Sequence, residues 1–108
     1  MHGTKIIILN WNGEGHLARF LPGVVAAAPE GVGVVVADNG STDGSLALLA
    51  RDFPQVQVVR LDRNYGFAEG YNRALAQVEA EYFVLLNSDV ETPVSYTHLR
   101  AHETRGNL

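Results

Sequence analysis

Carboxylate and amide side chains stand at the ends of two short apolar runs of the sequence. The run Val32–Ala37 is followed by Asp38, and the run Tyr82–Leu86 is followed by Asn87 and Asp89. A carboxylate placed like that of Asp38 accepts hydrogen bonds from a ribose hydroxyl or from the imino N–H of a pyrimidine base. The oxygen ligands of Asn87 and Asp89 suit Mg²⁺ or Mn²⁺, which bind a few protein groups together with substrate phosphates.

Each of these residues also has an ordinary structural interpretation. Asp38 and Asp43 are typical of a turn that caps a following helix, and Asn87 is typical of a polar strand end. A sharper signal comes from Gly70, which lies inside a helical pattern where glycine costs about 1 kcal/mol relative to alanine. We therefore expect another group to approach the backbone closely at Gly70.

The elements that must position these residues alternate along the chain. Apolar runs predict four β-strands, at Lys5–Leu9, Val32–Ala37, Val56–Leu61 and Tyr82–Leu86. Helical spacing of apolar residues lies between them, at about 17–28, 46–53 and 67–80. This order predicts an α/β fold with a mostly parallel four-stranded sheet and helices on both faces. The third run alternates partly, which favours a position near an edge, and ligands of such sheets bind beyond the carboxyl ends of the strands.

Composition narrows the class of protein. The 108 residues suffice for one small domain, and the net charge of −4 argues against a nucleic-acid-binding surface. There is no cysteine, so disulfides and thiolate metal sites are excluded. No apolar run approaches the roughly 20 residues of a membrane-spanning helix, and the first residues lack a signal-peptide pattern. We expect a cytoplasmic protein without a transmembrane segment.

The last residues differ in texture from the rest. Residues 94–108 have no sustained apolar face and a net charge of +1, against −5 for residues 1–92. We therefore divide the chain into a domain, 1–92, and a non-native or disordered tail, 93–108. His98 and His102 are spaced as metal ligands on a helix, but no third ligand is in view, which favours an incidental pair.

A rival pattern overlaps the start of the chain. Gly13, Gly15 and Ala18 fit G-x-G-x-x-A, and Asp38 lies 20 residues beyond Ala18, as in a dinucleotide-binding fingerprint. In the fingerprint, the first glycine follows the strand almost at once. Here Trp11 and Asn12 lie between the end of the predicted strand at Asn10 and Gly13. The pattern also leaves the polar segment Asn64–Asn72 without a role. An NAD(P)-binding dehydrogenase fragment therefore remains the less favoured alternative.

Four motifs taken together resemble the N-terminal half of family 2 glycosyltransferases. The matching stretches are Ile6–Gly13 (IIILNWNG), Val35–Ser45 (VVADNGSTDGS), Asn64–Asn72 (NYGFAEGYN) and Tyr82–Val90 (YFVLLNSDV). Their form is most similar to the rhamnosyltransferase type. The resemblance implies a three-layer, Rossmann-like GT-A half domain that binds a nucleotide-diphosphate-sugar donor.

The resemblance also assigns roles to single residues around the donor. It implies that Asn10 and Asn12 lie in the loop under the nucleotide and that Asp38 meets the base or ribose. It implies that Asn64 and Asn72 help to line the nucleotide pocket.

The Asp-x-Asp motif that the family usually carries falls on residues 87–89. The resemblance implies that Asp89 holds Mg²⁺ or Mn²⁺ on the diphosphate, with Asn87 among the substrate-binding residues. Because Asn87 replaces the first aspartate of the motif, one negative charge is missing from the expected metal site.

The reaction implied by the resemblance is direct displacement at the anomeric carbon, with inversion. A carboxylate base deprotonates the acceptor hydroxyl while the metal steadies the leaving diphosphate. In the family this base comes later in the chain, and we find no candidate for it here. We therefore expect a truncated enzyme that is inactive alone, or alternatively a non-catalytic nucleotide-binding module.

The parent enzyme and the tail complete these expectations. The acceptor is expected to be a glycan or a lipid-linked molecule, with the parent enzyme peripheral at the inner face of the membrane. The tail resembles a translated cloning adapter. An apolar face uncovered by the missing half is expected to cause poor solubility or self-association.

Overall fold

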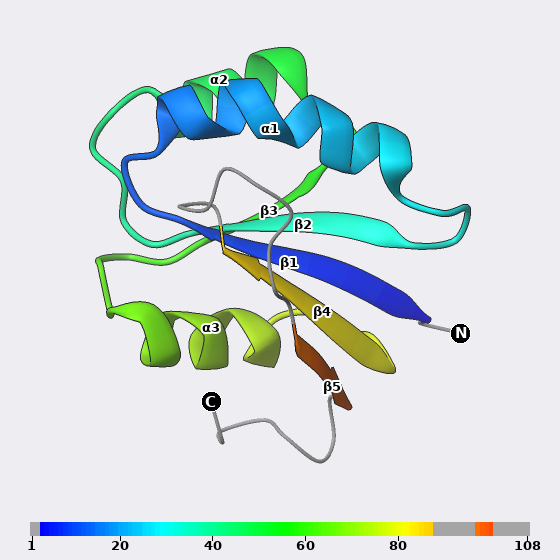
Figure 1. Ribbon diagram of the computed structural model, residues 1–108. Coiled ribbons are helices and arrows are strands. Elements are labelled where there is room, and N and C mark those ends of the chain that lie inside the picture. The colour runs from blue at the N-terminus through cyan, green and yellow to red at the C-terminus, as the bar shows by residue number, and fades with distance from the viewer. Residues whose placement is uncertain (1–2, 88–96, 101–108) are drawn as a thin grey trace.

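Strand β1 (Thr4–Asn10) lies at the centre of the sheet in the computed structural model, which describes residues 3–87 and 97–100. It pairs in parallel with β2 (Gly33–Asp38) on one side and with β4 (Tyr82–Asn87) on the other. Strand β3 (Gln57–Arg60) pairs in parallel with the far side of β2 and so lies at an edge. The predicted four parallel strands, with the third at an edge, are confirmed (Figure 1).

A fifth strand, β5 (Thr97–Arg100), extends the sheet beyond β4. It runs antiparallel to β4, with Tyr82 opposite Arg100, and gives the sheet the order β3-β2-β1-β4-β5. The sequence analysis did not predict this strand, because the segment lacks a sustained apolar pattern. An edge strand needs only backbone partners along one side, which composition does not reveal. The other residues of the predicted tail, including His102, lie outside the described residues.

The helices cover both faces of the sheet, which gives the three predicted layers. Helices α1 (Glu14–Ala27) and α2 (Ser45–Asp52) lie over one face, and α3 (Phe67–Ala76) lies over the other (Figure 1). Because side chains alternate along a strand, Ile8 packs with Leu17 under α1, whereas Ile7 packs with Tyr71 under α3. None of the helices within the described part of the chain is long and apolar enough to cross a membrane.

The register of the strands brings their polar ends to one edge. Asn10 at the end of β1 is opposite Asp38 at the end of β2, and Leu9 is opposite Asn87 at the end of β4. The loops that follow β1, β2 and β3 therefore leave the sheet at the same edge, and each loop leads into the helix that comes next in the chain. This carboxyl edge is where ligands of parallel sheets bind.

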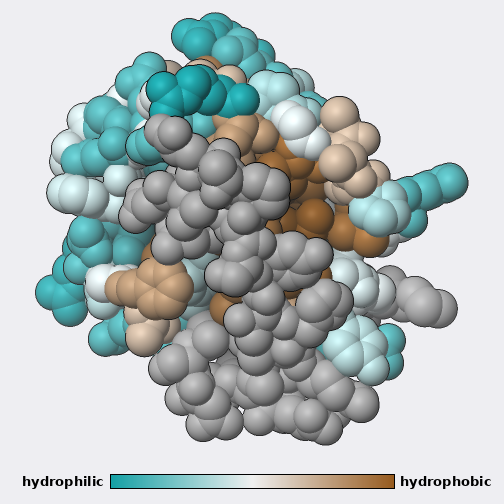
Figure 2. Space-filling model, in the orientation of Figure 1, coloured by the Kyte–Doolittle hydropathy of each residue, from teal (hydrophilic) through white to brown (hydrophobic). Residues whose placement is uncertain are grey.

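An apolar hollow of about 410 Å³ lies elsewhere, beside the second half of α1. Its lining includes Ile6 of β1, Val24 of α1, and Val84 and Leu86 of β4. Figure 2 shows apolar side chains gathered in this part of the surface. The uncovered apolar face and the self-association expected from the sequence both stay predictions.

Candidate functional site

Asp38 is the most enclosed carboxylate at the carboxyl edge. The residue is 1% exposed, and its Oδ1 accepts hydrogen bonds from Asn10 Nδ2 at 3.0 Å and from the Ser41 hydroxyl at 2.7 Å. Its Oδ2 accepts one from the Ser41 backbone N–H at 2.9 Å. Both carboxylate oxygens are thus occupied within the chain, which satisfies the buried charge. The structure therefore places Asp38 where it shapes the loop, and its expected contact with a base or ribose stays a prediction.

Asn10 is equally enclosed, as the last residue of β1. It is 0% exposed, and its Nδ2 is also 3.3 Å from the Ser41 hydroxyl oxygen. Its Oδ1 is buried without a hydrogen-bond partner and faces Gly13, where an added Cβ would stand 2.6 Å away. Asn10 was expected in the loop under the nucleotide. It is the last residue of β1 and is buried beneath that loop.

Asn12 joins the loop after β1 to the loop after β2. Its backbone takes the left-handed conformation, with φ 51°, which asparagine tolerates better than most residues. Its N–H donates to the Ser41 hydroxyl oxygen at 2.8 Å, and its Oδ1 accepts from the backbone N–H groups of Thr42 at 2.7 Å and Asp43 at 3.2 Å. The exposed Asn12 therefore holds both loops at the surface above Asp38.

Two carboxylates bind across the starts of α1 and α2. Asp43 accepts hydrogen bonds from the N–H of Glu14 at 3.2 Å and from the N–H and hydroxyl of Ser45 at 2.9 Å and 2.6 Å. In return, Glu14 accepts one from the N–H of Gly44 at 3.2 Å. Desolvation raises the pKa of Asp43, but the hydrogen bonds from Ser45 and Glu14 outweigh it and leave the pKa below its ordinary value. Each carboxylate thus lies at the positive end of the partner helix.

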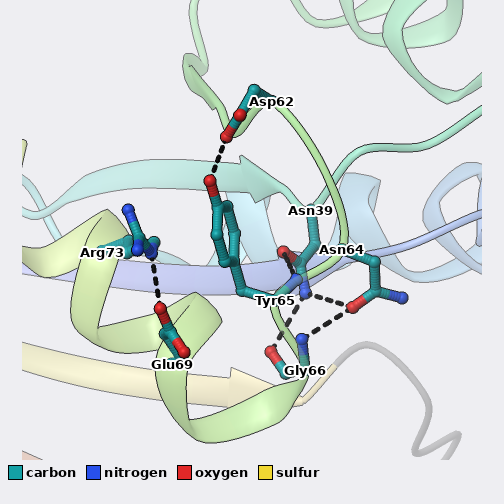
Figure 3. Close-up of polar contacts among 7 residues, drawn as sticks. All are labelled: Asn39, Asp62, Asn64, Tyr65, Gly66, Glu69 and Arg73. Carbon is teal, nitrogen blue, oxygen red and sulfur yellow. Dashed lines mark hydrogen bonds and ion pairs between the residues drawn. The ribbon is translucent and has the colours of Figure 1, made fainter.

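Asn39 organises the loop between β3 and α3, as Figure 3 shows. The residue is 2% exposed, and its Oδ1 accepts the backbone N–H of Tyr65 at 3.0 Å. Its Nδ2 donates to Asn64 Oδ1 and to the carbonyl of Gly66, both at 3.1 Å. The Gly66 N–H donates to the same Asn64 oxygen at 2.7 Å. Asn39 was named from the sequence only as part of the stretch Val35–Ser45, without a role of its own, because its partners lie 25–27 residues away along the chain.

Two glycines allow this close packing. An added Cβ at Gly70 would stand 3.0 Å from Asn39 Nδ2 and 3.2 Å from the Leu9 side chain, which confirms the close approach predicted at Gly70. Gly40 has φ +81°, and a Cβ there would meet the backbone of Arg63 at 2.6 Å. The loop after β2 therefore lies directly against the loop after β3.

Charged side chains surround Tyr65 on the outer side of the same loop. Its hydroxyl donates a short hydrogen bond to Asp62, which contributes most to a lowered pKa of that carboxyl. The guanidinium groups of Arg63 and Arg73 lie 4.9 Å and 3.9 Å from the centre of its ring. Arg73 also donates to Glu69 at 2.8 Å. These exposed contacts support the loop from outside.

Two large aromatic side chains remain exposed near the loops. Trp11 is 52% exposed beside Asn12, and Phe67 is 60% exposed at the first position of α3. Phe67 meets the ring of Tyr71 edge-on at 5.0 Å. The sequence analysis gave neither residue a ligand role, although an aromatic residue between two asparagines, as at Trp11, was an available signal.

The remaining predicted residues lie on α3 and at the end of β4. Asn72 is partly buried on α3, and its Oδ1 is buried without a hydrogen-bond partner. Asn87 ends β4, and Asp89 lies outside the described residues. Within residues 3–87 and 97–100, no cluster of three or more His, Cys, Asp or Glu side chains is placed to hold a metal. The expected metal site therefore depends on Asp89 and on ligand oxygens.

Known sequences resemble this chain over most of its length. The profile of the family described as Glycosyl transferase family 2 matches residues 5–97. An N-acetylglucosaminyl-diphospho-decaprenol L-rhamnosyltransferase of Mycobacterium tuberculosis is 33% identical over 73 residues, which are 68% of this chain and 24% of that protein. The uncharacterized glycosyltransferase YfnE of Bacillus subtilis is 38% identical over 80 residues, covering 69% of this chain and 20% of that protein. The chain thus spans less than a quarter of the length of either relative.

Solved structures share the same arrangement of strands and helices. The crystal structure of S. aureus TarS 1-349 in complex with UDP-GlcNAc superposes with a TM-score of 0.69 at 27% identity, over 81% of this chain and 26% of that one. A mannosyltransferase from Pyrobaculum calidifontis, in complex with GDP-Man and Mn²⁺, superposes with a TM-score of 0.68 at 23% identity, over 84% and 28%. The second likeness shows the fold alone.

Proposed function

The chain belongs to glycosyl transferase family 2, and from this premise we propose that it is the donor-binding part of a metal-dependent, inverting enzyme. That enzyme transfers a sugar from a nucleotide-diphosphate-sugar to an acceptor. The observation that carries the proposal is the joining of the loops after β1, β2 and β3 at one edge of the sheet through Asn12, Asp38 and Asn39. Family membership decides against the dehydrogenase fragment that the glycines near residue 13 suggested.

The nucleotide is proposed to lie on the exposed rim of these loops. Asn12 and Asn64 are exposed there, whereas Asn10 and Asp38 are buried beneath them. The half-exposed ring of Trp11 offers a face on which the base stacks, a contact worth about 1–3 kcal/mol in single-stranded nucleic-acid sites. Asn72, with its unpartnered Oδ1, is proposed as a further pocket residue.

A divalent cation is proposed to bind with the diphosphate at the end of β4. The donor chemistry of Asn87 and Asp89, one amide and one carboxylate, fits Mg²⁺ or Mn²⁺, which complete their shells with phosphate oxygens and water. When bound, the cation neutralises charge on the leaving diphosphate.

The activity of the isolated chain is proposed to stop at binding. No residue of this chain is assigned as the base for the acceptor hydroxyl, and the chain spans only 24% of the rhamnosyltransferase relative. That relative is named for a diphospho-decaprenol acceptor. We accordingly propose a glycan or lipid-linked acceptor for the whole enzyme, in polysaccharide synthesis at the inner face of the membrane.

Calorimetric titration of the 108-residue chain tests the proposal. UDP and dTDP are titrated with and without Mn²⁺, with NAD as the competing ligand class. We expect diphosphate binding that requires Mn²⁺ and that is lost in Asp89→Ala. The matched control is Glu30→Ala, which removes an exposed carboxylate from the loop before β2 and leaves the affinity unchanged.

Three outcomes contradict parts of the proposal. NAD binding that ignores Mn²⁺ would favour a dinucleotide site. Diphosphate binding that ignores both Mn²⁺ and Asp89→Ala would leave a nucleotide-binding module without the metal. Transfer of sugar by this chain alone would show that the remainder of the relatives' length is not needed for the reaction.

A further inference from the structure

We propose that Asn39 is a positioning residue, which fixes the side-chain amide of Asn64 so that its N–H₂ group, and never its oxygen, faces the bound nucleotide. The inference rests on the proposed function, since it takes the ligand to be a nucleoside diphosphate. It goes further by stating which kind of ligand atom Asn64 recognises and which buried residue decides this.

The orientation of Asn39 follows from backbone groups that cannot exchange roles. The Tyr65 N–H is a donor, so the Asn39 atom 3.0 Å from it must be the oxygen. The Gly66 carbonyl is an acceptor, so the Asn39 atom 3.1 Å from it must be the nitrogen. Both observations agree, and Asn39 therefore has a single amide orientation.

The orientation of Asn64 follows from the same logic. Its Oδ1 receives the Gly66 N–H at 2.7 Å and the Asn39 Nδ2 at 3.1 Å. Turning the Asn64 amide over would bring its N–H₂ group against two donors and lose both hydrogen bonds. Figure 3 shows the Nδ2 of Asn64 on the side away from Asn39 and Gly66. An exposed Asn64 thus offers only donors to a ligand.

Packing around Asn39 prevents the network from adjusting. Asn39 is 2% exposed, and Gly70 leaves only enough space for its Nδ2. Gly40, next in sequence, lies against the backbone of Arg63. A change of amide orientation at Asn39 would therefore require both the loop and α3 to move.

A donor at this place recognises an acceptor oxygen of the ligand. Within a nucleoside diphosphate, such oxygens belong to the nucleoside, as base carbonyls or ribose hydroxyls, or to the phosphates. Both sources share the same chemistry, and separate titrations with UDP, uridine and pyrophosphate distinguish them. A contact to the nucleoside makes uridine sensitive to Asn64 variants, whereas a contact to phosphate makes pyrophosphate sensitive.

Asn64→Asp is the sharpest variant, because it changes one exposed atom group and keeps the fold. One carboxylate oxygen still accepts from Gly66 and Asn39, while the other replaces the outward donor by an acceptor. We expect UDP affinity in the presence of Mn²⁺ to fall about tenfold or more, as for the loss of a hydrogen bond to a charged or buried partner. Unchanged affinity would overturn the inference.

Asn39→Asp tests the positioning role itself. A carboxylate at 39 still accepts the Tyr65 N–H but repels Asn64 Oδ1, so that the Asn64 amide turns over and donates to the carboxylate. That charge-assisted hydrogen bond outweighs the lost bond from the Gly66 N–H. We expect about a tenfold loss of UDP affinity in the otherwise unchanged chain and little further loss in an Asn64→Ala background. Equal losses in both backgrounds would show that Asn39 acts without Asn64. Asp62→Asn, in the same loop, is the matched control, with affinity expected to stay within about twofold.

A measurement without ligand separates this inference from the proposed function. Hydrogen exchange of side-chain amides, followed by NMR, should show protected Asn39 and rapidly exchanging Asn64 protons. In Asn39→Asp, the Asn64 protons should become protected as they turn inward. If exchange follows this pattern but UDP does not bind, Asn39 does fix the Asn64 amide. The proposed function and the contact between Asn64 and a nucleotide are then both wrong. If exchange of Asn64 is slow in the unchanged chain, the positioning role is wrong.

Discussion

Two hydrogen-bond networks meet at the carboxyl edge, and they use different chemistry. The network of the α1 and α2 loops contains carboxylates, with Asp38 buried and Asp43 and Glu14 across the helix starts. The network of the α3 loop is built from the neutral amides of Asn39 and Asn64. A charged network responds to pH, whereas a neutral one fixes which atoms donate and which accept. The difference teaches that one edge combines a charged network, in which the pKa of Asp43 is lowered, with a neutral network of fixed donors and acceptors.

The largest expected effect comes from a substitution that pushes apart the loops of the two networks. Gly40→Ala places a Cβ 2.6 Å from the Arg63 backbone and forces alanine into φ +81°, so we expect a loss of about 3 kcal/mol in unfolding free energy. Gly31→Ala is the matched control, because φ is +89° there and nothing lies within 4 Å. It should cost only about 1 kcal/mol in urea unfolding. Equal costs would mean that the close approach of the loops does not matter.

The neutral network should show a cost that does not depend on pH. Asn39→Ala leaves the Tyr65 N–H and the Gly66 carbonyl without their buried partner, for an expected loss of about 2 kcal/mol. Because no charge is removed, the difference from the unchanged chain should be the same at about pH 7 and about pH 4. A difference that shrinks on acidification would argue that charges hold this loop.

The charged network should show the opposite behaviour. The pKa of Asp43 lies below its ordinary value of 3.8 in the folded chain, so its stabilisation is fully present above that value. The stabilisation is lost as pH falls through the lowered pKa. We expect Asp43→Asn to cost about 1 kcal/mol near neutral pH, as for loss of a helix cap, and progressively less in acid. Urea unfolding across that pH range measures the trend, and a constant cost would contradict it.

The smallest effect concerns the charged side chains outside the neutral network. Arg73→Gln removes the guanidinium that lies 3.9 Å from the centre of the Tyr65 ring, and because this contact is exposed to solvent we expect the smallest loss of unfolding free energy of the series. Arg51→Gln is the control, since Arg51 pairs with the neighbouring Asp52 on α2. A loss for Arg73→Gln several times larger than the control would show that charge supports the α3 loop more than the amides do.

The sequence predicted the sheet better than it predicted the site. Apolar runs located the four parallel strands to within one or two residues, because strands buried on both faces leave continuous apolar segments. Glycine at position 70 correctly predicted a close approach, since a helix interior disfavours glycine without a reason. The third helix ends at Ala76, earlier than the apolar pattern suggested, because Val78 packs in the core from beyond the helix end.

The roles of polar residues were less predictable. Asp38 and Asn10 are buried and hydrogen-bonded within the chain, and their expected contacts with a ligand stay a prediction. Asn39 was given no role from the sequence, yet it organises a loop more than 20 residues away. Residue type and spacing show that polar groups gather at one edge. Whether a given group faces inward or outward depends on long-range contacts that a local pattern does not contain.

The position of β1 at the middle of the sheet also has a consequence for synthesis of the protein. Strand β1 leaves the ribosome before the other described strands, and one of its two neighbours, β4 (Tyr82–Asn87), follows only after β2 and β3. One side of the central strand therefore stays without its partner until most of the chain has been translated. Contacts between segments so distant in sequence slow folding. The nascent chain therefore passes through a stage in which one edge of β1 is unpaired, the kind of edge that chaperones shield from aggregation.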